Sequence, residues 1–332
     1  MSYLKWCLKI FLPLALGFYL TWYFFDEMSE DAMSSFYRAL READYAVVAL
    51  SLIFGIISYW SRAERWKYTL EPMGFESNSW NRYHSLMIGY IVNLAVPRAG
   101  EASRALMLQR SDNIPFTKSF GTIITERIVD VLILAIITLI TCAFAYNDFW
   151  QLYKAMLVKF GVEKSESSSG LWLPIIFGVV LLGIGIVLLV KSLRIRLFKF
   201  SKSLIEGLLS IFSLKHPWYY FGHSVLIWGC YIVMFILPYF ALEETKNVPL
   251  EGMMLAFIAG SLGISFTNGG IGMYPLLVGF VTAYYLENEN PNESLAIANA
   301  LGMLIWGSQA IIMLVMGLIS LYCLPKNHVA HE

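Results

Sequence analysis

Charged residues are scarce in this chain of 332 residues, because Asp, Glu, Lys and Arg together make up only 14% of it. Ordinary soluble domains carry about 25% charged residues, so the composition excludes an ordinary soluble domain. Positive and negative charges balance to a net charge of zero, which gives no reason to expect a nucleic-acid partner. Hydrophobic residues make up 58% of the chain and fall in long runs. The composition therefore predicts a membrane protein.

Signals for metal, nucleotide or covalent chemistry are missing as well. The cysteines are spaced neither as a zinc site nor as a disulfide framework: Cys7, Cys142, Cys230 and Cys323. The five histidines form no spaced cluster with carboxylates or cysteines, so we expect neither a metal nor another cofactor. No phosphate-binding glycine loop and no nucleophile elbow occurs, which disfavours an ATP-driven pump.

The apolar runs predict about six spanning helices, at residues 4–25, 45–61, 120–146, 171–190, 221–242 and 294–324. Each run reaches the length of about 17 residues that a helix needs to cross a bilayer. Segments 84–119 and 252–286 contain Pro or Gly breakers, and we expect each to form a re-entrant helical hairpin. The predicted fold is an all-α polytopic membrane protein with a single domain over 1–332. Its halves, 1–146 and 171–324, would each hold one hairpin.

The first hairpin contains the segment Pro97-Arg98-Ala99-Gly100-Glu101-Ala102-Ser103-Arg104, which places three ionisable side chains next to an apolar run. A charge at the bilayer centre costs at least about 2.5–3.5 kcal/mol on insertion scales, so it needs a partner, a water-filled cavity or a ligand. Pro97 and Gly100 interrupt the helix, and freed backbone groups at this depth are tolerated only inside protein or along a cavity. We interpret the segment as a broken helix that holds a polar site.

The distribution of charge predicts the orientation. Lys and Arg concentrate at 1–9, 62–82 and 191–217, whereas the loops at 26–44, 243–251 and 287–293 are acidic. The positive-inside rule places the basic segments in the cytoplasm. They share that side only if the two hairpins enter from opposite faces, which also puts both termini in the cytoplasm. Opposed broken helices are typical of transporters with inverted repeats. Eight ordinary spans, the alternative, would separate 62–82 from 191–217 or require an unmarked span between them.

Four short motifs resemble one family in the same order. The segment 97–104 resembles the proline and Gly-Glu-x-x-Arg signature of the lysylphosphatidylglycerol synthase transmembrane region, also called the flippase-like domain family. Residues 62–66 are similar to its Arg/Trp segment, 125–130 to its Glu-Arg-x-x-Asp element and 268–272 to its Pro-Gly-Gly-x-Gly turn, with Asn268 in place of the proline. The resemblance implies a bacterial inner-membrane protein that handles a lipid. Some members carry a soluble aminoacyltransferase domain that is absent here, so we expect no lipid aminoacylation by this chain.

The candidate binding residues of the first hairpin are Arg98, Glu101 and Arg104. Glu101 and Arg104 lie three residues apart, so they share a helix face and can pair. The pair either locks the hairpin as a structural ion pair or, with Arg98, leaves positive charge for a phosphate, which arginine binds with two parallel hydrogen bonds. Backbone N–H groups at a broken-helix N-terminus would add to the same field.

Three further groups complete the candidate set. Glu126, Arg127 and Asp130 form a second charged cluster, either at a solvated helix start or in the site. The glycines of the second hairpin, with Asn268, either form a simple turn or expose backbone groups at its tip: Gly269, Gly270 and Gly272. We expect a third group to anchor the membrane interface, as basic and aromatic residues commonly do: Arg62, Arg65 and Trp66.

The sequence therefore predicts a transporter that moves an anionic or zwitterionic phospholipid, or a lipid-linked headgroup, between leaflets. Membrane lipids would be its partners, with no nucleic acid; a homo-oligomer and a lipid-modifying enzyme remain open as protein partners. One alternative is an integral-membrane transferase that uses Glu101, Glu126 or Asp130 as a base. Another is an accessory subunit of a lipid-modifying enzyme.

Overall fold

A computed structural model describes residues 15–19, 21–23, 25–26, 28–96, 99–159, 214–286 and 290–324. The chain divides into two compact units, one of residues 1–145 with 214–332 and the other of residues 146–213. In the smaller unit the structure describes one helix, α7 (Tyr146–Lys159). Every candidate site residue that the structure describes belongs to the larger unit.

The described part of the larger unit contains helices and no strand, which confirms the predicted all-α class. Its helices are α2 (Glu30–Glu42), α3 (Tyr45–Leu70), α4 (Ser79–Ala95), α5 (Gly100–Asp112), α6 (Phe116–Phe144), α10 (Pro217–Ile236), α11 (Leu250–Phe266), α12 (Met273–Ala283) and α13 (Pro291–Cys323). Three short 3₁₀ turns accompany them: η1 (Glu71–Met73), η2 (Leu237–Ala241) and η3 (Asn268–Gly270).

Four helices among the described residues are long and apolar enough to cross a membrane. They cover Tyr45–Met73, Phe116–Phe144, Pro217–Ala241 and Pro291–Cys323. These agree with four of the six predicted spans, and the protein is a polytopic membrane protein. The predicted span at 171–190 lies outside the described residues, as does most of the span at 4–25.

Helix α3 is longer than the sequence analysis predicts, because it continues to Leu70 instead of ending at Ser61. The prediction ended the span where Arg62 introduces charge. Charge does not end the helix here, because carboxylates of α6 neutralise the arginines of α3 inside the protein. The basic stretch is therefore the last part of one long helix, with Arg62 and Arg65 buried, and not a separate surface segment.

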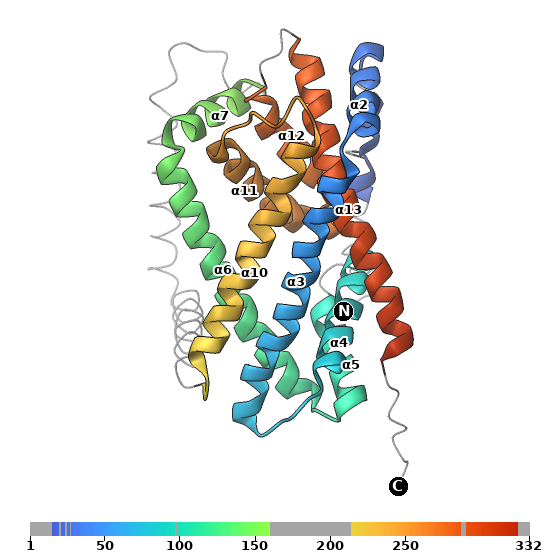
Figure 1. Ribbon diagram of the computed structural model, residues 1–332, viewed down its shortest axis with the longest axis vertical. Helices are drawn as coiled ribbons and strands as arrows, with labels where there is room; N and C mark the ends of the chain where they lie inside the picture. The colour runs from blue at the N-terminus through green and yellow to red at the C-terminus, as the bar shows by residue number, and fades with distance from the viewer. Residues whose placement is uncertain are drawn as a thin grey trace, which may run out of the picture. The chain divides into compact units, whose positions relative to one another are not determined.

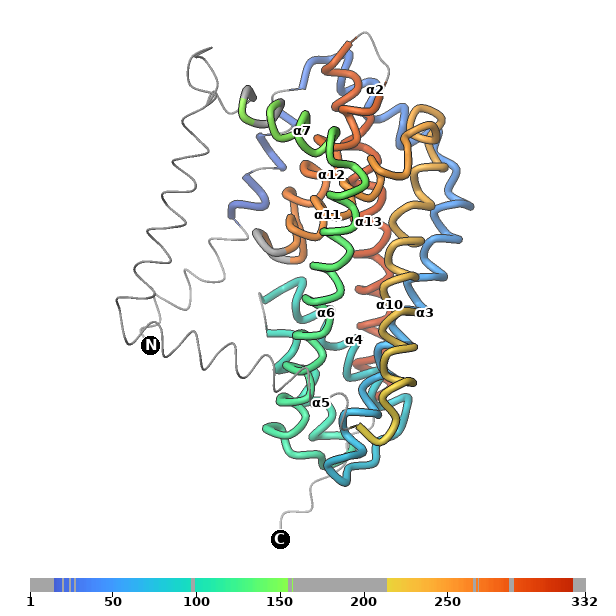
Figure 2. The backbone as a smooth tube through the Cα atoms, turned by 90° about the vertical axis from the view of Figure 1, so that its left-hand side faces the viewer, coloured from blue at the N-terminus to red at the C-terminus, as the bar shows by residue number. Residues whose placement is uncertain are grey.

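The two predicted hairpins are both present, and each lies between two long helices in the chain order. The first, α4–α5, follows α3 and precedes α6; the second, α11–α12, follows α10 and precedes α13. Figure 1 shows α3 running downward into a hairpin at the lower end, and α10 running upward into a hairpin at the upper end. Figure 2 shows the same opposed placement after a quarter turn. Among the described helices, the order long helix, hairpin, long helix thus occurs twice, and the two hairpins lie at opposite ends.

Neither hairpin returns through a full-length helix. Helix α5 has 13 residues and α12 has 11, which correspond to lengths of about 20 Å and 16 Å. The hydrocarbon core is about 30 Å thick. These two helices are therefore too short to span, and each begins inside the helical bundle, at the buried Gly100 and Tyr274.

The first hairpin is closed by a glycine contact. Gly89 on α4 and Gly100 on α5 lie so close that a Cβ atom on Gly100 would overlap the carbonyl oxygen of Gly89. The side chain of Asn93 accepts a hydrogen bond of 2.7 Å from the backbone N–H of Gly100. Because the first N–H groups of a helix have no partner in the helix itself, this contact satisfies one of them and fixes the start of α5.

The second hairpin turns through glycines with left-handed backbone angles: Gly269, Gly270 and Gly272 have φ values of 57°, 82° and 73°. Residues with a Cβ atom adopt this region only at a cost, so the turn requires glycine. The tip meets the first hairpin, since a Cβ atom on Gly269 would lie 2.9 Å from the side chain of Leu94 on α4. The indole N–H of Trp306 on α13 donates a 2.7 Å hydrogen bond to the carbonyl of Gly269.

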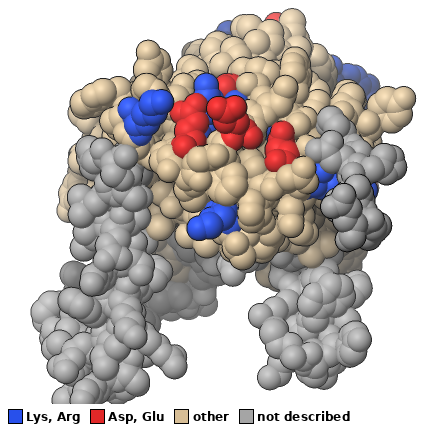
Figure 3. Space-filling model, turned by 90° about the horizontal axis from the view of Figure 1, so that it is seen from below, with Lys and Arg blue, Asp and Glu red and all other residues tan. Residues whose placement is uncertain are grey.

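The lower end of the larger unit, where α3 leads to α4 and α5 leads to α6, carries charges of both signs (Figure 3). Exposed side chains on these helix ends and loops include Lys67, Glu76, Arg110 and Lys118. The charged side chains that join α3, α5 and α6 differ from these, because most of them are enclosed by the protein.

We predict that Gly100→Ala destabilises the protein, because the added methyl group overlaps the backbone of α4; overpacking of this kind typically costs about 1–3 kcal/mol. Thermal unfolding in detergent measures the change. Gly121→Ala on α6 is the control, because nothing lies within 4 Å of the added atom, and alanine there should be neutral or slightly stabilising. Equal unfolding temperatures for the two variants would contradict the close helix contact.

Candidate functional site

The centre of the site is a set of mostly buried ion pairs, which we call the ion cluster. We define it as Arg62, Arg65, Glu101, Arg104, Glu126, Arg127 and Asp130. Asp130 on α6 accepts hydrogen bonds from Arg62 at 2.7 Å and Arg65 at 2.9 Å, both on α3. Arg65 also donates to the hydroxyl of Ser224 on α10 at 3.0 Å. One carboxylate thus holds two arginines of α3 in place.

Glu126, one turn before Asp130 on α6, binds Arg104 of α5 through both of its oxygens, at 2.9 Å and 3.3 Å. The guanidinium of Arg104 lies 3.7 Å from the ring centre of Trp66 on α3. Trp66 is fully buried, and its indole N–H donates to the hydroxyl of Thr122 at 2.8 Å. The planar guanidinium is therefore stacked on one face and paired at its edge, a geometry that a lysine does not reproduce.

Arg127 occupies the outer edge of the ion cluster. It pairs with Glu101 of α5 at 3.1 Å and with Asp130 at 3.7 Å, and its side chain is 40% exposed. Arg62, Arg65 and Arg104 are exposed by no more than 3%. Arg127 is thus the arginine of the ion cluster that an incoming molecule reaches most readily.

The charges of the ion cluster do not balance. Its four guanidinium groups meet three carboxylates, which leaves one positive charge. The Nε atoms of Arg62, Arg65 and Arg104 are buried and have no hydrogen-bond partner among the described residues. Buried charges are costly unless they are paired, so the surplus favours an anionic ligand.

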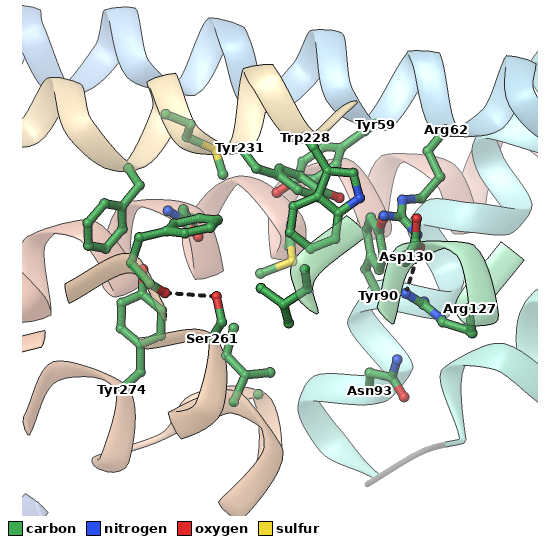
Figure 4. A pocket seen from close by; sticks show the side chains of 18 of the residues that line it. Tyr59, Arg62, Tyr90, Asn93, Arg127, Asp130, Trp228, Tyr231, Ser261 and Tyr274 are labelled. Atoms are coloured by element: carbon green, nitrogen blue, oxygen red, sulfur yellow. Dashed lines mark hydrogen bonds and ion pairs between the residues drawn. The ribbon is translucent and has the colours of Figure 1, made fainter. Parts of the chain in front are cut away.

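A cavity of about 420 Å³ lies beside the ion cluster, between the tips of the two hairpins. Figure 4 shows Arg62, Arg127 and Asp130 at one end of it, with Tyr90 and Asn93 close by, and Ser261 and Tyr274 at the other end. The rings of Trp228 and Tyr231 lie between these ends. Residues that line the cavity come from α3, α4, α6, α10, α11, α12, α13 and the turn η3.

The cavity is charged at one end and largely apolar elsewhere. Helix α6 contributes Arg127 and Asp130 to the charged end and, one turn further along, Val131 and Leu134 to the apolar wall. Val131 on α6 and Ile264 on α11 both line the cavity while remaining 64% and 49% exposed. Within the described residues, the cavity therefore reaches the surface past an aliphatic rim between α6 and α11.

The structure groups the predicted site residues differently from the prediction. Glu101 and Arg104 do not pair with each other, because α6 lies alongside α5 and supplies Arg127 to one and Glu126 to the other. Arg62, Arg127, Asp130 and Gly269 line the cavity. The other members of the ion cluster are not among its lining residues. Gly270 and Gly272 are not among the lining residues. Arg98 lies outside the described residues, as does the side chain of Asn268.

The interfacial role predicted for Arg62, Arg65 and Trp66 does not fit their burial, because their exposures are 3%, 0% and 0%. The three residues face the helices α5, α6 and α10 instead of lipid headgroups. The spacing of these residues in the sequence indicates this arrangement. Positions three and four apart share one helix face, as do Glu126 and Asp130 on α6. Opposite charges on two such faces predict a contact between the helices.

The aromatic wall was not predicted at all. Its members come from three helices that are distant in the sequence: Tyr59 on α3, Tyr90 on α4, and Trp228 and Tyr231 on α10. Aromatic residues inside spanning helices are common, so their positions in the sequence carry no signal for a shared cavity.

The fold and the site define a polytopic membrane protein with a charged cavity between two opposed helical hairpins. The chain belongs to the family of the lysylphosphatidylglycerol synthase transmembrane region, whose sequence profile matches residues 10–290. This agrees with the resemblance drawn from the four motifs.

Two curated proteins are similar to parts of the chain. One is glycosyltransferase AglD of Haloferax volcanii, 31% identical over 97 residues, which are 29% of this chain and 16% of that protein. The other is the UPF0104 membrane protein MJ1595 of Methanocaldococcus jannaschii, 29% identical over 105 residues, which are 31% of each chain. The matched stretches thus span less than a third of either relative. No solved structure matches the chain.

We predict that Arg104→Leu lowers stability by about 3–5 kcal/mol, because it leaves the buried carboxylate of Glu126 without its bidentate partner. Glu126→Leu should lower stability by a similar amount, because it leaves the buried guanidinium of Arg104 without its carboxylate. The double variant should lose less than the sum of the two, and thermal unfolding of all four proteins measures this coupling.

Lys67→Ala is the matched control for this cycle, since Lys67 pairs with Glu71 at 3.4 Å but is 46% exposed. Exposed pairs contribute about 0–1 kcal/mol, so the control should unfold near the wild-type temperature. Strictly additive losses in the Arg104 and Glu126 variants would show that the two side chains do not interact.

Proposed function

We propose that the protein transports a lipid with a phosphate-containing headgroup across the membrane, and that the headgroup binds in the cavity beside the ion cluster. The observation that carries the proposal is the surplus guanidinium charge at one end of a cavity that is largely apolar elsewhere. Arginine binds phosphate through parallel, charge-assisted hydrogen bonds. Of the arginines in the cavity wall, Arg127 is the most accessible, and it exchanges Glu101 for phosphate when the headgroup enters.

The shape of the cavity supports an amphiphile as the substrate. Its charged end suits the phosphate, and the aliphatic rim at Val131 and Ile264 suits the start of the acyl or prenyl chain. A lipid whose headgroup is enclosed while its tail remains in the bilayer avoids the cost of moving an uncovered charge through hydrocarbon.

The opposed hairpins supply a means of alternating access. Their tips meet beside the cavity, where Leu94 packs on Gly269. Movement of one hairpin opens the cavity toward one face and movement of the other opens it toward the opposite face, as inverted repeats do in many transporters. In this proposal the lower end, which carries the basic segment 62–82, faces the cytoplasm, and the positive-inside rule supports that orientation.

The membrane transferase alternative requires a carboxylate that is free to accept a proton. The three candidates are each held by arginine: Glu101 at 3.1 Å, Glu126 at 2.9 Å and Asp130 at 2.7 Å. A transferase would therefore first have to release one of them from its guanidinium partner. The proposal therefore assigns these residues to structure and charge balance and includes no catalytic group.

We expect Arg127→Gln to lower the rate of lipid translocation by about tenfold or more, because a hydrogen bond to a charged group contributes about 1.5–3 kcal/mol. The assay uses protein reconstituted in liposomes and follows loss of labelled phosphatidylglycerol from the inner leaflet. Arg110→Gln is the control: this arginine is exposed in the last turn of α5 and does not line the cavity.

The control variant should retain the wild-type rate. Thermal unfolding of both variants separates a binding defect from a folding defect. A folded Arg127→Gln protein with the wild-type rate would remove Arg127 from phosphate binding, and wild-type protein that moves no phosphate lipid would refute the proposed transport.

A further inference from the structure

The aromatic wall of the cavity indicates more than phosphate recognition. Four rings stand next to the charged end: Tyr59, Tyr90, Trp228 and Tyr231. They form two edge-to-face pairs, with 5.2 Å between the ring centres of Tyr59 and Tyr90 and 6.1 Å between those of Trp228 and Tyr231. A phosphate alone needs no such wall, since aromatic faces are electron-rich and do not attract an anion.

Polar groups accompany the rings. The indole N–H of Trp228 is buried and has no hydrogen-bond partner among the described residues. Asn93, Ser261 and Gln309 also line the cavity. Hydroxyl and amide groups both donate and accept hydrogen bonds, so the wall presents aromatic faces together with groups that match hydroxyls of a ligand.

Two classes of headgroup bind aromatic faces: cationic amines, through the negative charge of the ring face, and sugars, through the C–H groups on the face of the sugar ring. The charges of the site disfavour the cation. Asp130 is the one carboxylate among the described lining residues, and it already binds Arg62 and Arg65. The ring of Tyr231 already faces the guanidinium of Arg62 at 5.7 Å. An ammonium group would meet a surplus of positive charge and no free carboxylate.

We propose that the headgroup is a neutral sugar joined to the lipid through a phosphodiester, with the phosphate on Arg62 and Arg127 and the sugar against Trp228 and Tyr231. This inference rests on the proposed function and narrows its substrate class. A phosphodiester carries one negative charge, which equals the surplus of the ion cluster. The unpaired indole N–H of Trp228 then donates to a sugar hydroxyl.

The test compares three synthetic diesters with the same prenyl chain and the same phosphate: polyprenyl phosphoglucose, polyprenyl methyl phosphate and polyprenyl phosphocholine. Competition for purified protein in detergent, read by native mass spectrometry, measures their relative affinities. We expect the sugar diester to bind more tightly than the methyl diester, by about tenfold or more. The choline diester should bind no more tightly than the methyl diester.

Variants of Trp228 test whether this ring causes the preference for the sugar diester over the methyl diester. Trp228→Leu should reduce the sugar-to-methyl ratio to nearly one, and Trp228→Phe, which keeps an aromatic face, should retain part of it. Trp218→Leu on the same helix is the control, because Trp218 is 82% exposed and outside this cavity, and it should keep the full ratio.

The outcomes separate the two proposals. Equal binding of the sugar and methyl diesters, or tighter binding of the choline diester, would overturn the sugar assignment while leaving phosphate-lipid transport intact. Failure of all three diesters to bind wild-type protein would overturn the phosphate site itself. Because the wild-type comparison decides the first question, a variant that does not fold leaves the test valid.

Discussion

The ion cluster is the constraint on which the rest of the structure depends. Asp130 and Glu126 lie one turn apart on α6, a helix that is apolar and largely exposed from Val131 to its end. Each would be very costly without a counterion, so α3 and α5 must pack at one side of α6 to supply arginines. Helix α10 packs on α3, where the hydroxyl of Ser224 accepts a hydrogen bond from Arg65. The pairing thereby determines where four helices meet, and with that the position of the cavity.

Charge pairing of this kind defines a geometry more than it adds stability. A buried ion pair gains little over a well-packed apolar contact, yet it tolerates few alternative arrangements. In this protein the arrangement leaves one surplus guanidinium charge at the wall of a cavity whose other surfaces are mostly apolar and aromatic. The same interaction that orders the helices thus prepares a place for an anionic group inside a membrane protein.

Much of the architecture was predictable because lipid imposes simple rules on a sequence. Runs of apolar residues indicated the long helices, and Pro97, Gly100 and the Gly269–Gly272 turn indicated where two helices break. Prediction was less successful for charged residues. Arg62 was expected to end a span, and Glu101 was expected to bind Arg104, because a single sequence shows neighbours along one helix and not the charges that a second helix brings.

The sequence by itself determined the class of protein, the order of long helices and hairpins, and the presence of more charge than a lipid-facing helix tolerates. Periodicity and hydropathy are local properties, so they can be read without coordinates. Only the tertiary structure decided which carboxylate meets which arginine, and that Tyr59, Tyr90, Trp228 and Tyr231 share one wall. Those contacts join residues that are far apart in the chain, and they follow from how whole helices pack.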